Sequence, residues 1–296
     1  MKPVAWVLNL DAEDELARGG AHTPTAAMTA RIHALLPRLA GLIRPGDQVI
    51  WPQPPSPSPR GGEGRGEGIP LPGRAWCPTR WALEQMERSG VSVPRAPGVE
   101  VLRKVNHRRF CHELGQTLPG AGFAWNAAEL TALISSGPRE WLIKRPLGYA
   151  GRGRRKLRMG ELTAADQAWV DASLRDGEGV QVEPWVSIEV ECALHGFLTE
   201  DGQCTWGVPT IQRVDATGAW QSSAVAHSEL TAPETEALKH EGTRVVLALH
   251  AASYFGPFGI DGFRWRSAEG KIWFQPRSEI NARYSMGWAT GMGETS

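Results

Sequence analysis

The sequence predicts a mixed α/β protein with two or three subdomains. Its first part alternates strand, helix and strand, which is typical of a parallel α/β unit. Strand and helix patterns keep alternating beyond about residue 100, and the chain closes on a β-hairpin, because two apolar runs flank a turn-like Ser-Ala-Glu-Gly. The segments that carry these observations are Val4–Leu10, Thr25–Leu42 and Gln48–Trp51 in the first part, and Gly259–Trp265 and Lys271–Phe274 in the hairpin.

Composition excludes several classes of protein. Lys plus Arg and Asp plus Glu number 32 each in 296 residues, so no net field favours nucleic acid or a membrane surface. No stretch approaches the ~20 apolar residues that a membrane-spanning helix needs. The four cysteines show no CxxC spacing. We therefore expect a cytoplasmic protein with reduced thiols that binds neither nucleic acid nor membrane.

The first lobe is expected to span residues 1–100, and the rest of the chain, 101–296, forms a second unit. Residues 52–73 are almost wholly Pro, Gly, Ser and charge, which predicts a low-complexity insertion in a surface loop. Asn9, Asp11 and the acids after them follow the first strand, where α/β sheets bind ligands. A solvated acidic loop is the simpler interpretation, and on sequence alone we favour it.

Helices in the remainder are predicted from apolar residues at helical spacing, with Asn as the first cap of two of them and Gly near several ends. Strands are predicted from short apolar or alternating runs. The predicted helices are Arg80–Arg88, Asn106–Gly115, Asn126–Ile134, Leu162–Leu174 and Pro233–Tyr254, and the predicted strands are Trp141–Lys144, Val180–Val186, Glu189–Leu194 and Thr205–Arg213.

The first group of residues that suggests chemistry is Lys144 followed by Gly148, Gly151 and Gly153. A strand presents the lysine, and glycines allow backbone N–H groups to approach phosphate oxygens. The order differs from a P-loop and from the dinucleotide fingerprint, since the lysine comes first and no GK[ST] or third fingerprint glycine follows. A basic turn between two strands is an equally good interpretation of this segment alone.

The second group is Glu183 and Trp185, followed by Glu189 and Glu191. A carboxylate at a strand end with an extended linker after it suits an adenine amino group, and either later glutamate could accept from ribose hydroxyls. Taken alone, alternating Glu-Val-Glu is more often the solvent-facing side of a strand.

The third group lies in the closing hairpin, where Asp261 belongs to the first run and Glu279 and Asn281 follow the second. Glu279 and Asn281 are two residues apart, so on an extended backbone they share a face. Three such oxygen ligands are the kind that Mg²⁺ binds. Arg283 would place a positive charge beside that metal. A solvated acidic face is the alternative.

The order of these groups resembles the ATP-grasp superfamily of ATP-dependent ligases, through IKRPLGYAGRG, VEPWVSIEVE and GIDGF…SEINAR. The resemblance implies a parallel α/β lobe followed by a two-lobed nucleotide-binding domain of α+β lobes. It implies the following roles: Lys144 and Gly148, Gly151 and Gly153 contact phosphates; Glu183 and the backbone near Trp185 hold adenine; Glu189 or Glu191 holds ribose; Asp261, Glu279 and Asn281 bind Mg²⁺; and Arg283 steadies the transferred phosphate.

Two departures from the family pattern stand out. The second phosphate-contacting lysine is replaced by Arg108 in Asn106-His107-Arg108, which keeps the charge with another geometry. The spacing from Asp261 to Glu279 is long, and a proline before the glutamate argues for a bulge or an edge strand. On the sequence, Asp261 is therefore the least secure metal ligand.

The resemblance implies a ligase that uses ATP and Mg²⁺ to join a carboxylate to an amine through an acylphosphate. A non-catalytic ATP-binding regulatory module and a small-molecule kinase of the same superfamily stay open as alternatives. The expected partners are small-molecule carboxylate and amine substrates, with a homodimer as an open alternative to a monomer.

Overall fold

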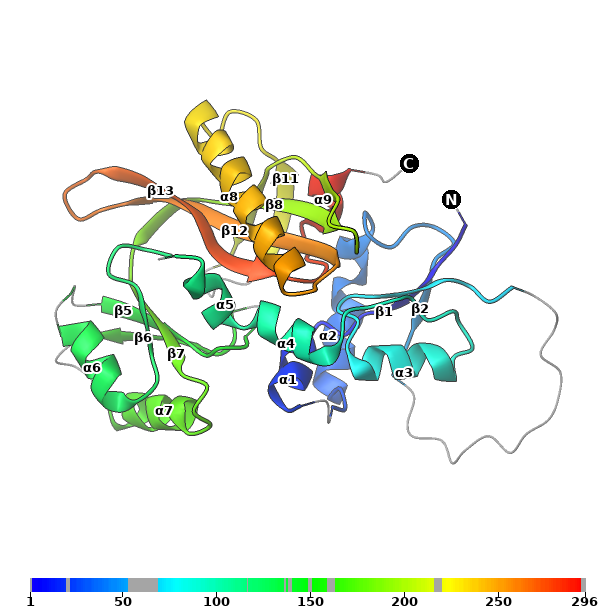
Figure 1. Ribbon diagram of the computed structural model, residues 1–296, viewed down its shortest axis with the longest axis horizontal. Helices are drawn as coiled ribbons and strands as arrows, with labels where there is room; N and C mark the ends of the chain where they lie inside the picture. The colour runs from blue at the N-terminus through cyan, green and yellow to red at the C-terminus, as the bar shows by residue number, and fades with distance from the viewer. Residues whose placement is uncertain are drawn as a thin grey trace.

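The structure, a computed structural model, describes residues 2–19, 22–52, 69–115, 117–135, 137, 140–148, 151–158, 163–215 and 220–293. Within these ranges the strands form three sheets, which we call the N-terminal, central and C-terminal sheets (Figure 1). Helices pack against each sheet, so the expected mixed α/β class is confirmed. No helix in the described ranges combines the length and apolar character needed to cross a membrane.

The N-terminal sheet is the parallel unit that the strand–helix–strand pattern predicts. Its strands are β1 (Ala5–Val7), β2 (Gln48–Ile50) and β3 (Gly73–Ala75), in the order β2-β1-β3 and all parallel. Most of the expected insertion, residues 53–68, lies outside the described residues, and its last residue, Gly73, already belongs to β3. The helices of this unit are α1 (Ala12–Ala17), α2 (Ala26–Leu35), the 3-10 helix η1 (Leu36–Leu39) and α3 (Arg80–Arg88).

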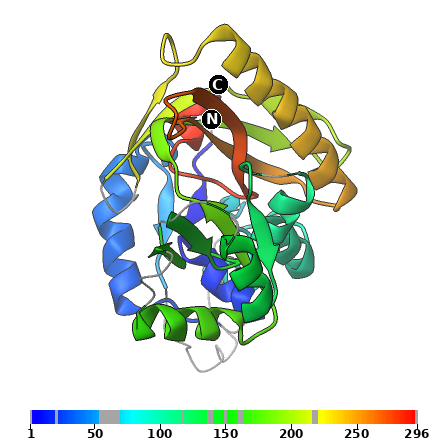
Figure 2. The ribbon, with the colours of Figure 1, turned by 90° about the vertical axis from the view of Figure 1, so that its left-hand side faces the viewer.

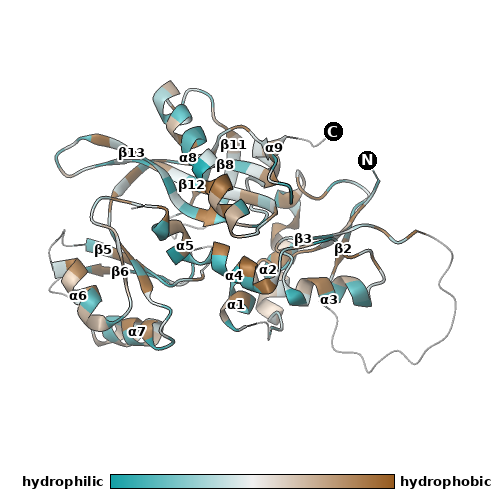
Figure 3. Ribbon diagram, viewed as in Figure 1, coloured by the Kyte–Doolittle hydropathy of each residue, from teal (hydrophilic) through white to brown (hydrophobic). Residues whose placement is uncertain are grey.

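The central sheet is antiparallel and has the strand order β4-β7-β5-β6. Its strands alternate, with apolar side chains facing α6 and α7 and mostly polar side chains on the other face. Figure 3 shows brown, apolar residues on these two helices. The bounds are β4 (Gly122–Ala124), β5 (Glu140–Lys144), β6 (Arg154–Arg158), β7 (Val180–Pro184), α6 (Ala127–Ser135) and α7 (Ala164–Leu174).

The C-terminal sheet has the order β11-β10-β8-β12-β13, and β9 pairs with β8 outside this path. Helix α8 begins with the capping box of Thr231 and Glu234 and packs on one face of the sheet. The bounds are β8 (Ser187–Leu198), β9 (Cys204–Trp206), β10 (Thr210–Val214), β11 (Trp220–Val225), β12 (Gly256–Arg266), β13 (Ile272–Asn281), α8 (Ala232–Ala251) and α9 (Trp288–Met292). Figure 2 shows this sheet with α8 above and the central sheet with α6 and α7 below.

Two short helices, α4 (Val99–Asn106) and α5 (Arg108–Glu113), link the N-terminal unit to the central sheet. The prediction that Asn106 caps one helix over 106–115 is wrong. Asn106 ends α4, and its side-chain oxygen accepts from the backbone N–H of Ala282 at 2.9 Å, a tertiary contact. His107 caps α5 instead, because its ring nitrogen accepts from the N–H of Arg109 at 3.1 Å.

One hydrophobic core joins the N-terminal sheet to the C-terminal sheet. Trp6 of β1 is fully buried and meets the ring of Tyr284 edge-on, with ring centroids 5.1 Å apart. Tyr284 in turn packs against Trp288 of α9, and both belong to the cluster that contains Leu249 of α8. This core contains residues from both sides of residue 100. The expected division into two units near that residue stays a prediction.

Candidate active site

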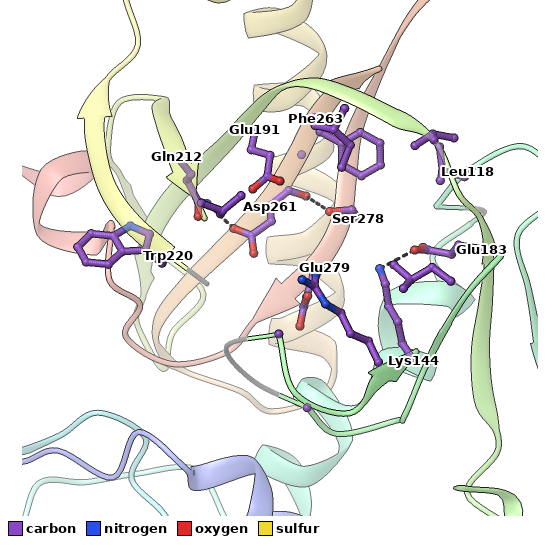
Figure 4. Close-up of a pocket in the computed structure, with 18 of the residues that line it drawn as sticks. Leu118, Lys144, Glu183, Glu191, Gln212, Trp220, Asp261, Phe263, Ser278 and Glu279 are labelled. Atoms are coloured by element: carbon purple, nitrogen blue, oxygen red, sulfur yellow. Dashed lines mark hydrogen bonds and ion pairs between the residues drawn. The ribbon is translucent and has the colours of Figure 1, made fainter. Parts of the chain in front are cut away.

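A cavity of about 610 Å³ opens between the polar face of the central sheet and one face of the C-terminal sheet (Figure 4). Residues from all three predicted groups line it. The predicted residues on its wall are Arg108, Lys144, Gly148, Gly151, Glu183, Trp185, Glu191, Asp261, Glu279, Asn281 and Arg283. Segments up to about 175 residues apart in the chain therefore meet at one place.

Lys144 lies at the end of β5 and forms a buried ion pair with Glu183 of β7. Its Nζ is 2.5 Å from Glu183 Oε2, and the two side chains are 12% and 3% exposed. The other oxygen of Glu183 accepts from Thr117 Oγ1 at 2.5 Å and from Gln181 Nε2 at 3.0 Å. The carboxylate is thus well satisfied, and it fixes the direction in which Lys144 points.

The glycine loop joins β5 to β6 and borders the cavity. Residues 149 and 150 lie outside the described part, and the rest of the loop turns on Gly151 and Gly153, whose φ angles are 78° and 70°. Such positive φ angles favour glycine. At Gly148 an added Cβ would stand 2.8 Å from the carbonyl oxygen of Arg152, so the close approach of the two loop arms requires glycine. Gly153 is not on the cavity wall, and its carbonyl accepts from the N–H of Arg145 at 2.7 Å.

Arg108, the first residue of α5, is the positive charge between the glycine loop and the C-terminal sheet. Its Nη2 is 2.9 Å from Glu279 Oε1, and its Nε donates to the carbonyl oxygen of Arg145 at 3.1 Å. Its Nη1 is buried and has no hydrogen-bond partner among the described residues. The side chain of Arg108 itself lines the cavity.

The closing hairpin brings Asp261 directly opposite Glu279, despite the long spacing that made Asp261 the least secure ligand. Asp261 pairs with Glu279 and Phe263 pairs with Gln275, so the single residue Gly262 stands opposite residues 276–278 of β13. The bulge accommodates the extra residues between Asp261 and Glu279, and it lies on β13, an edge strand of the sheet. Both features confirm the prediction of a bulge or an edge strand at Pro276. Both acids belong to strands, because β13 extends through Glu279 to its last residue, Asn281.

Hydrogen bonds hold the side chain of Asp261 in place. Asn281 Nδ2 donates to Asp261 Oδ2 at 2.9 Å, and Gln212 Nε2 donates to Asp261 Oδ1 at 2.9 Å. The Oγ of Ser278 also donates to the backbone carbonyl of Asp261 at 3.1 Å, which fixes the bulge. Two carboxylates and an amide thus share one face of the hairpin.

The two carboxylates differ in their ionisation. Burial, together with the neighbouring Glu279 carboxylate, raises the pKa of Asp261 to about 6. Burial acts in the same direction on Glu279, but the charges of Arg108 and Lys144 outweigh it and lower its pKa. Two neighbouring carboxylates, one of them with a raised pKa, repel each other when both are ionised. A bound cation would reduce this repulsion.

Within the described ranges no group of three or more His, Cys, Asp and Glu side chains is arranged to hold a metal ion on its own. The donors at the hairpin are two carboxylates and one amide. Mg²⁺ is commonly bound by one or two carboxylates together with substrate phosphates and water. The donor chemistry of Asp261, Glu279 and Asn281 therefore fits Mg²⁺ held jointly with a phosphate ligand.

A second bulge decides which of the two candidate ribose carboxylates faces the cavity. In the β8–β12 pairing Val190 stands opposite Arg264 and Ile188 opposite Trp265, so Glu189 is an extra residue. The extra residue reverses the alternation. Glu191 lines the cavity, and burial raises its pKa, whereas Glu189 pairs with Arg266 on the other side at 2.6 Å.

Trp185 lines the mouth of the cavity with an indole that is 46% exposed. Its ring lies 4.2 Å from Lys156 Nζ, a cation–π contact. Its backbone N–H donates to the carbonyl oxygen of Glu140 at 3.0 Å. That N–H is therefore already used within the fold.

Arg283 lines the cavity but is held by the N-terminal unit. Its Nε and Nη2 both lie 2.5 Å from Glu13 Oε1, and its Nη1 donates to the carbonyl oxygen of Tyr284 at 3.0 Å. Burial raises the pKa of Glu13 although Arg283 opposes the shift, and Glu13 Oε2 has no partner among the described residues. Arg283 thus lies at the cavity, and each of its three guanidinium nitrogens already has an acceptor.

The interpretation of the first acidic run as a solvated loop is wrong. Asp11, Glu13 and Glu15 are each less than 5% exposed. Glu15 accepts from Thr79 Oγ1 and from the N–H of Trp81, both within 2.8 Å. Sequence alone could not show this, because an acidic run is typical of a surface loop and the partners lie more than 60 residues away.

Sequence reasoning missed Gln212 and Trp220, which line the cavity from β10 and β11. Gln212 stands opposite Glu191 in the sheet and reaches Asp261. The signal that could have found it is alternation along the predicted strand Thr205–Arg213, once β10 is known to neighbour β8. Nothing in the sequence singles out Trp220 from the other tryptophans.

Comparisons with known proteins identify the fold. No family model matches the chain, and no curated protein matches it in sequence. Among solved structures, the chain is similar to a biotin carboxylase–βγ-ATP complex from Campylobacter jejuni (TM-score 0.54, 12% identity, 78% of this chain and 56% of that one). It is also similar to the N5-carboxyaminoimidazole synthetase of Staphylococcus aureus in complex with ADP (TM-score 0.52, 11% identity, 96% and 72%).

A third similar structure is the biotin carboxylase domain of the Hydrogenobacter thermophilus 2-oxoglutarate carboxylase, with MgADP, ADP and bicarbonate (TM-score 0.52, 15% identity, 69% and 45%). The chain spans about half the length of each of the two biotin carboxylase structures. At these identities the likeness establishes the fold. The chain has the fold of the ATP-grasp superfamily, as the order of its motifs predicts.

Proposed function

We propose that the protein is an ATP- and Mg²⁺-dependent ligase that joins a carboxylate to an amine. The observation that carries the proposal is the meeting of Lys144, Arg108 and the glycine loop with the Asp261–Glu279 pair in one cavity. Cations on one wall and carboxylates on the other suit a polyphosphate with its metal. The similar structures contain ADP, MgADP or βγ-ATP, which supports the same ligand class here.

The cavity suggests how ATP would lie. The phosphates would contact Lys144 Nζ, the guanidinium of Arg108 and the N–H groups of the glycine loop. The adenine base of ATP would lie towards Trp185 and the extended linker after Glu183. Glu191 would accept hydrogen bonds from the ribose hydroxyls. Glu189 is no longer proposed for this role, since it lies on the far side of the sheet.

Asp261, Glu279 and Asn281 would hold Mg²⁺. A bound Mg²⁺ would neutralise phosphate charge, and it would compensate the burial and the Glu279 repulsion that raise the pKa of Asp261. Arg108 sits between this group and the glycine loop, so it balances Glu279 and faces the phosphates at once. The chain's own contribution is positioning and charge neutralisation.

In the proposed reaction a carboxylate oxygen of the substrate attacks the γ-phosphorus of ATP. The bond to the β-phosphate oxygen breaks, ADP leaves and an acylphosphate forms. The amine nitrogen then attacks the acyl carbon, phosphate leaves with the former carboxylate oxygen, and the nitrogen loses a proton. Arg283 would stabilise the transferred phosphate once its Nη2 turns from Glu13 to that group.

The test is a screen of small acids and amines in pairs, with release of ADP and phosphate as the readout and mass spectrometry of the product. The proposal expects ADP only when both an acid and an amine are present. Release of AMP in place of ADP would contradict it. ADP release with an acid alone, and with a stable phosphorylated product, would favour the kinase alternative.

One observation favours the non-catalytic alternative, an ATP-binding regulatory module. Each of the three guanidinium nitrogens of Arg283 already contacts Glu13 or the carbonyl oxygen of Tyr284. A module of this kind would bind ATP with Mg²⁺ and show no turnover with any acid–amine pair. The same screen separates the two functions when ATP binding is measured beside it.

A further inference from the structure

A buried arginine in the bulge of β13, Arg277, takes part in none of the sequence motifs. Its side chain is 3% exposed, and its Nε is 2.5 Å from Glu241 Oε1 on α8. Its Nη1 donates to the carbonyl oxygen of Cys111, and its Nη2 donates to that of Gly115 at 3.1 Å. The guanidinium thus satisfies three acceptors from two other segments.

Two of these acceptors lie at the C-terminal end of α5, where a helix leaves its last carbonyl groups without internal partners. A second arginine, Arg244 of α8, donates to the carbonyl oxygen of Leu114 at 2.6 Å and also pairs with Glu241 at 2.6 Å. Glu241 therefore balances both arginines. The end of α5 is anchored to β13 and α8 through this cluster.

The other end of α5 is tied to the same strand. Arg108, its first residue, pairs with Glu279, which follows Arg277 by two positions on β13. The strand therefore holds α5 at both ends, through one arginine that belongs to the strand and one that belongs to the helix. At six residues, α5 is too short to be stable by its own hydrogen bonds, so these contacts set its position.

We propose that Arg277 is a positioning residue of the candidate active site, which sets α5 so that Arg108 reaches both Glu279 and the bound phosphates. The part that concerns phosphates rests on the proposed function, whereas the part that concerns α5 does not. A lysine would keep the charge beside Glu241, but one ammonium group cannot span the three acceptors of a planar guanidinium.

A matched control exists in the neighbouring strand. Arg264 of β12 donates from Nε to Glu234 Oε1 of α8 at 2.7 Å, and from Nη2 to the carbonyl oxygen of Glu229 at 2.8 Å. This pair links the same hairpin to the same helix, and no contact of Arg264 to α5 is present in the described part of the chain. Arg277→Met and Arg264→Met each break one Arg–Glu pair, which is destabilising in both cases.

The experiment measures ATP affinity of the full chain by calorimetry with excess Mg²⁺. We expect Arg277→Met to raise the Kd by about tenfold, the loss of roughly one good contact, and Arg264→Met to change it less than about twofold. Arg277→Lys should lie between wild type and Arg277→Met. Equal weakening by both methionine variants, or no weakening by Arg277→Met, would overturn the proposal.

Hydrogen exchange of the α5 amides without ligand keeps the two proposals apart. We expect these amides to exchange faster in Arg277→Met than in Arg264→Met, whatever the protein binds. If wild type binds no ATP, the proposed function fails and exchange alone decides the role of Arg277. Equal exchange of the α5 amides in Arg277→Met and Arg264→Met would refute the positioning role of Arg277. Should Arg277→Met fail to fold, Arg277→Lys and Glu241→Gln take its place in both measurements.

Discussion

Asp261 is a carboxylate of the cavity with a pKa well above its ordinary value. Its two oxygens accept from Gln212 and Asn281, yet burial and the Glu279 carboxylate still raise its pKa to about 6. Amide donors stabilise the charged form, but here they do not outweigh desolvation and like-charge repulsion. The folded protein therefore favours the protonated form of Asp261, and a bound cation would favour the ionised form instead.

A dependence of stability on pH follows. The pKa of Asp261 lies near 6 in the folded chain and near 3.8 in the unfolded chain, so between these values the folded state binds more protons. Stability without ligand must then fall as pH rises from about 4 to 6, by up to about 3 kcal/mol from this residue. Unfolding in urea at several pH values should show that Asp261→Asn removes this loss.

The exposed Asp171→Asn on α7 is the control and should leave the pH dependence as it is. Mg²⁺ competes with the proton on Asp261, so Mg²⁺–ATP should stabilise wild type more at pH 7.5 than at pH 5. Equal stabilisation at both pH values would contradict the assignment of Asp261 to the metal.

The two glutamates of β8 give a second test at the residue scale. Glu191 faces the cavity and Glu189 pairs with Arg266 on the other side. Glu191→Gln removes a charged acceptor and should weaken ATP binding by about 1.5–3 kcal/mol, or more than tenfold. Glu189→Gln should leave the Kd unchanged. Calorimetry on the two variants decides, and the reverse pattern would show that the bulge at Glu189 is placed wrongly.

Residue types and their order could be read from the sequence, whereas side-chain partners could not. Lys144 and Glu183 were assigned to phosphate and adenine separately, and the structure pairs them at 2.5 Å. The motif predicts Arg283 beside the metal, and the structure pairs it with Glu13, which lies 270 residues earlier. A long-range ion pair leaves no pattern in a single sequence, so such partners need the fold.

At the scale of elements, the β12–β13 hairpin shows how backbone irregularity makes a site. The sequence predicted the hairpin, its turn and a bulge or edge near Pro276. It did not predict the length of the bulge, and that length brings Asp261 opposite Glu279. The bulge in β8 likewise separates Glu189 from Glu191. Bulges change which side chains share a face, and periodicity alone cannot locate them.

Gly262 is the test of the hairpin bulge. A Cβ there would lie 2.8 Å from the carbonyl oxygen of Gln275, so Gly262→Ala must push residues 276–278 outward and shift Glu279. We expect a loss of stability of about 1–3 kcal/mol from overpacking and a loss of Mg²⁺-dependent stabilisation by ATP. Thermal denaturation with and without Mg²⁺–ATP measures both.

Gly98→Ala is the matched control, since a Cβ at Gly98 meets no other atom within 4 Å. It should leave the response to Mg²⁺–ATP as it is in wild type. A Gly262→Ala variant that still responds like wild type would show that the bulge does not set the metal ligands.

At the scale of the whole molecule, the N-terminal unit and the C-terminal sheet share one core. Trp6, fully buried, contacts Tyr284, and the pair Glu13–Arg283 crosses the same boundary. The sequence predicted the order of the lobes and their strand–helix content. It could not show that the core is continuous, because apolar spacing marks the buried face of an element but not what covers it.

A shared core predicts cooperative unfolding. Trp6→Ala should lower the stability of the whole chain by about 3–5 kcal/mol, the usual cost of truncating a buried aromatic residue. Near-ultraviolet and far-ultraviolet circular dichroism should report one coincident thermal transition in wild type and in the variant. Two separated transitions, with only the first shifted by Trp6→Ala, would mean that the N-terminal unit folds independently of the rest.

The most direct test of the account is calorimetric titration of ATP into the full chain with and without Mg²⁺. Glu279→Gln removes one of the two opposed carboxylates, and Glu189→Gln serves as the matched control outside the cavity. We predict saturable 1:1 binding that requires Mg²⁺ in wild type and in Glu189→Gln, and that is lost or at least tenfold weaker in Glu279→Gln. Absence of binding in wild type, or equal binding by all three proteins, would contradict the assignment of this cavity to Mg²⁺–ATP.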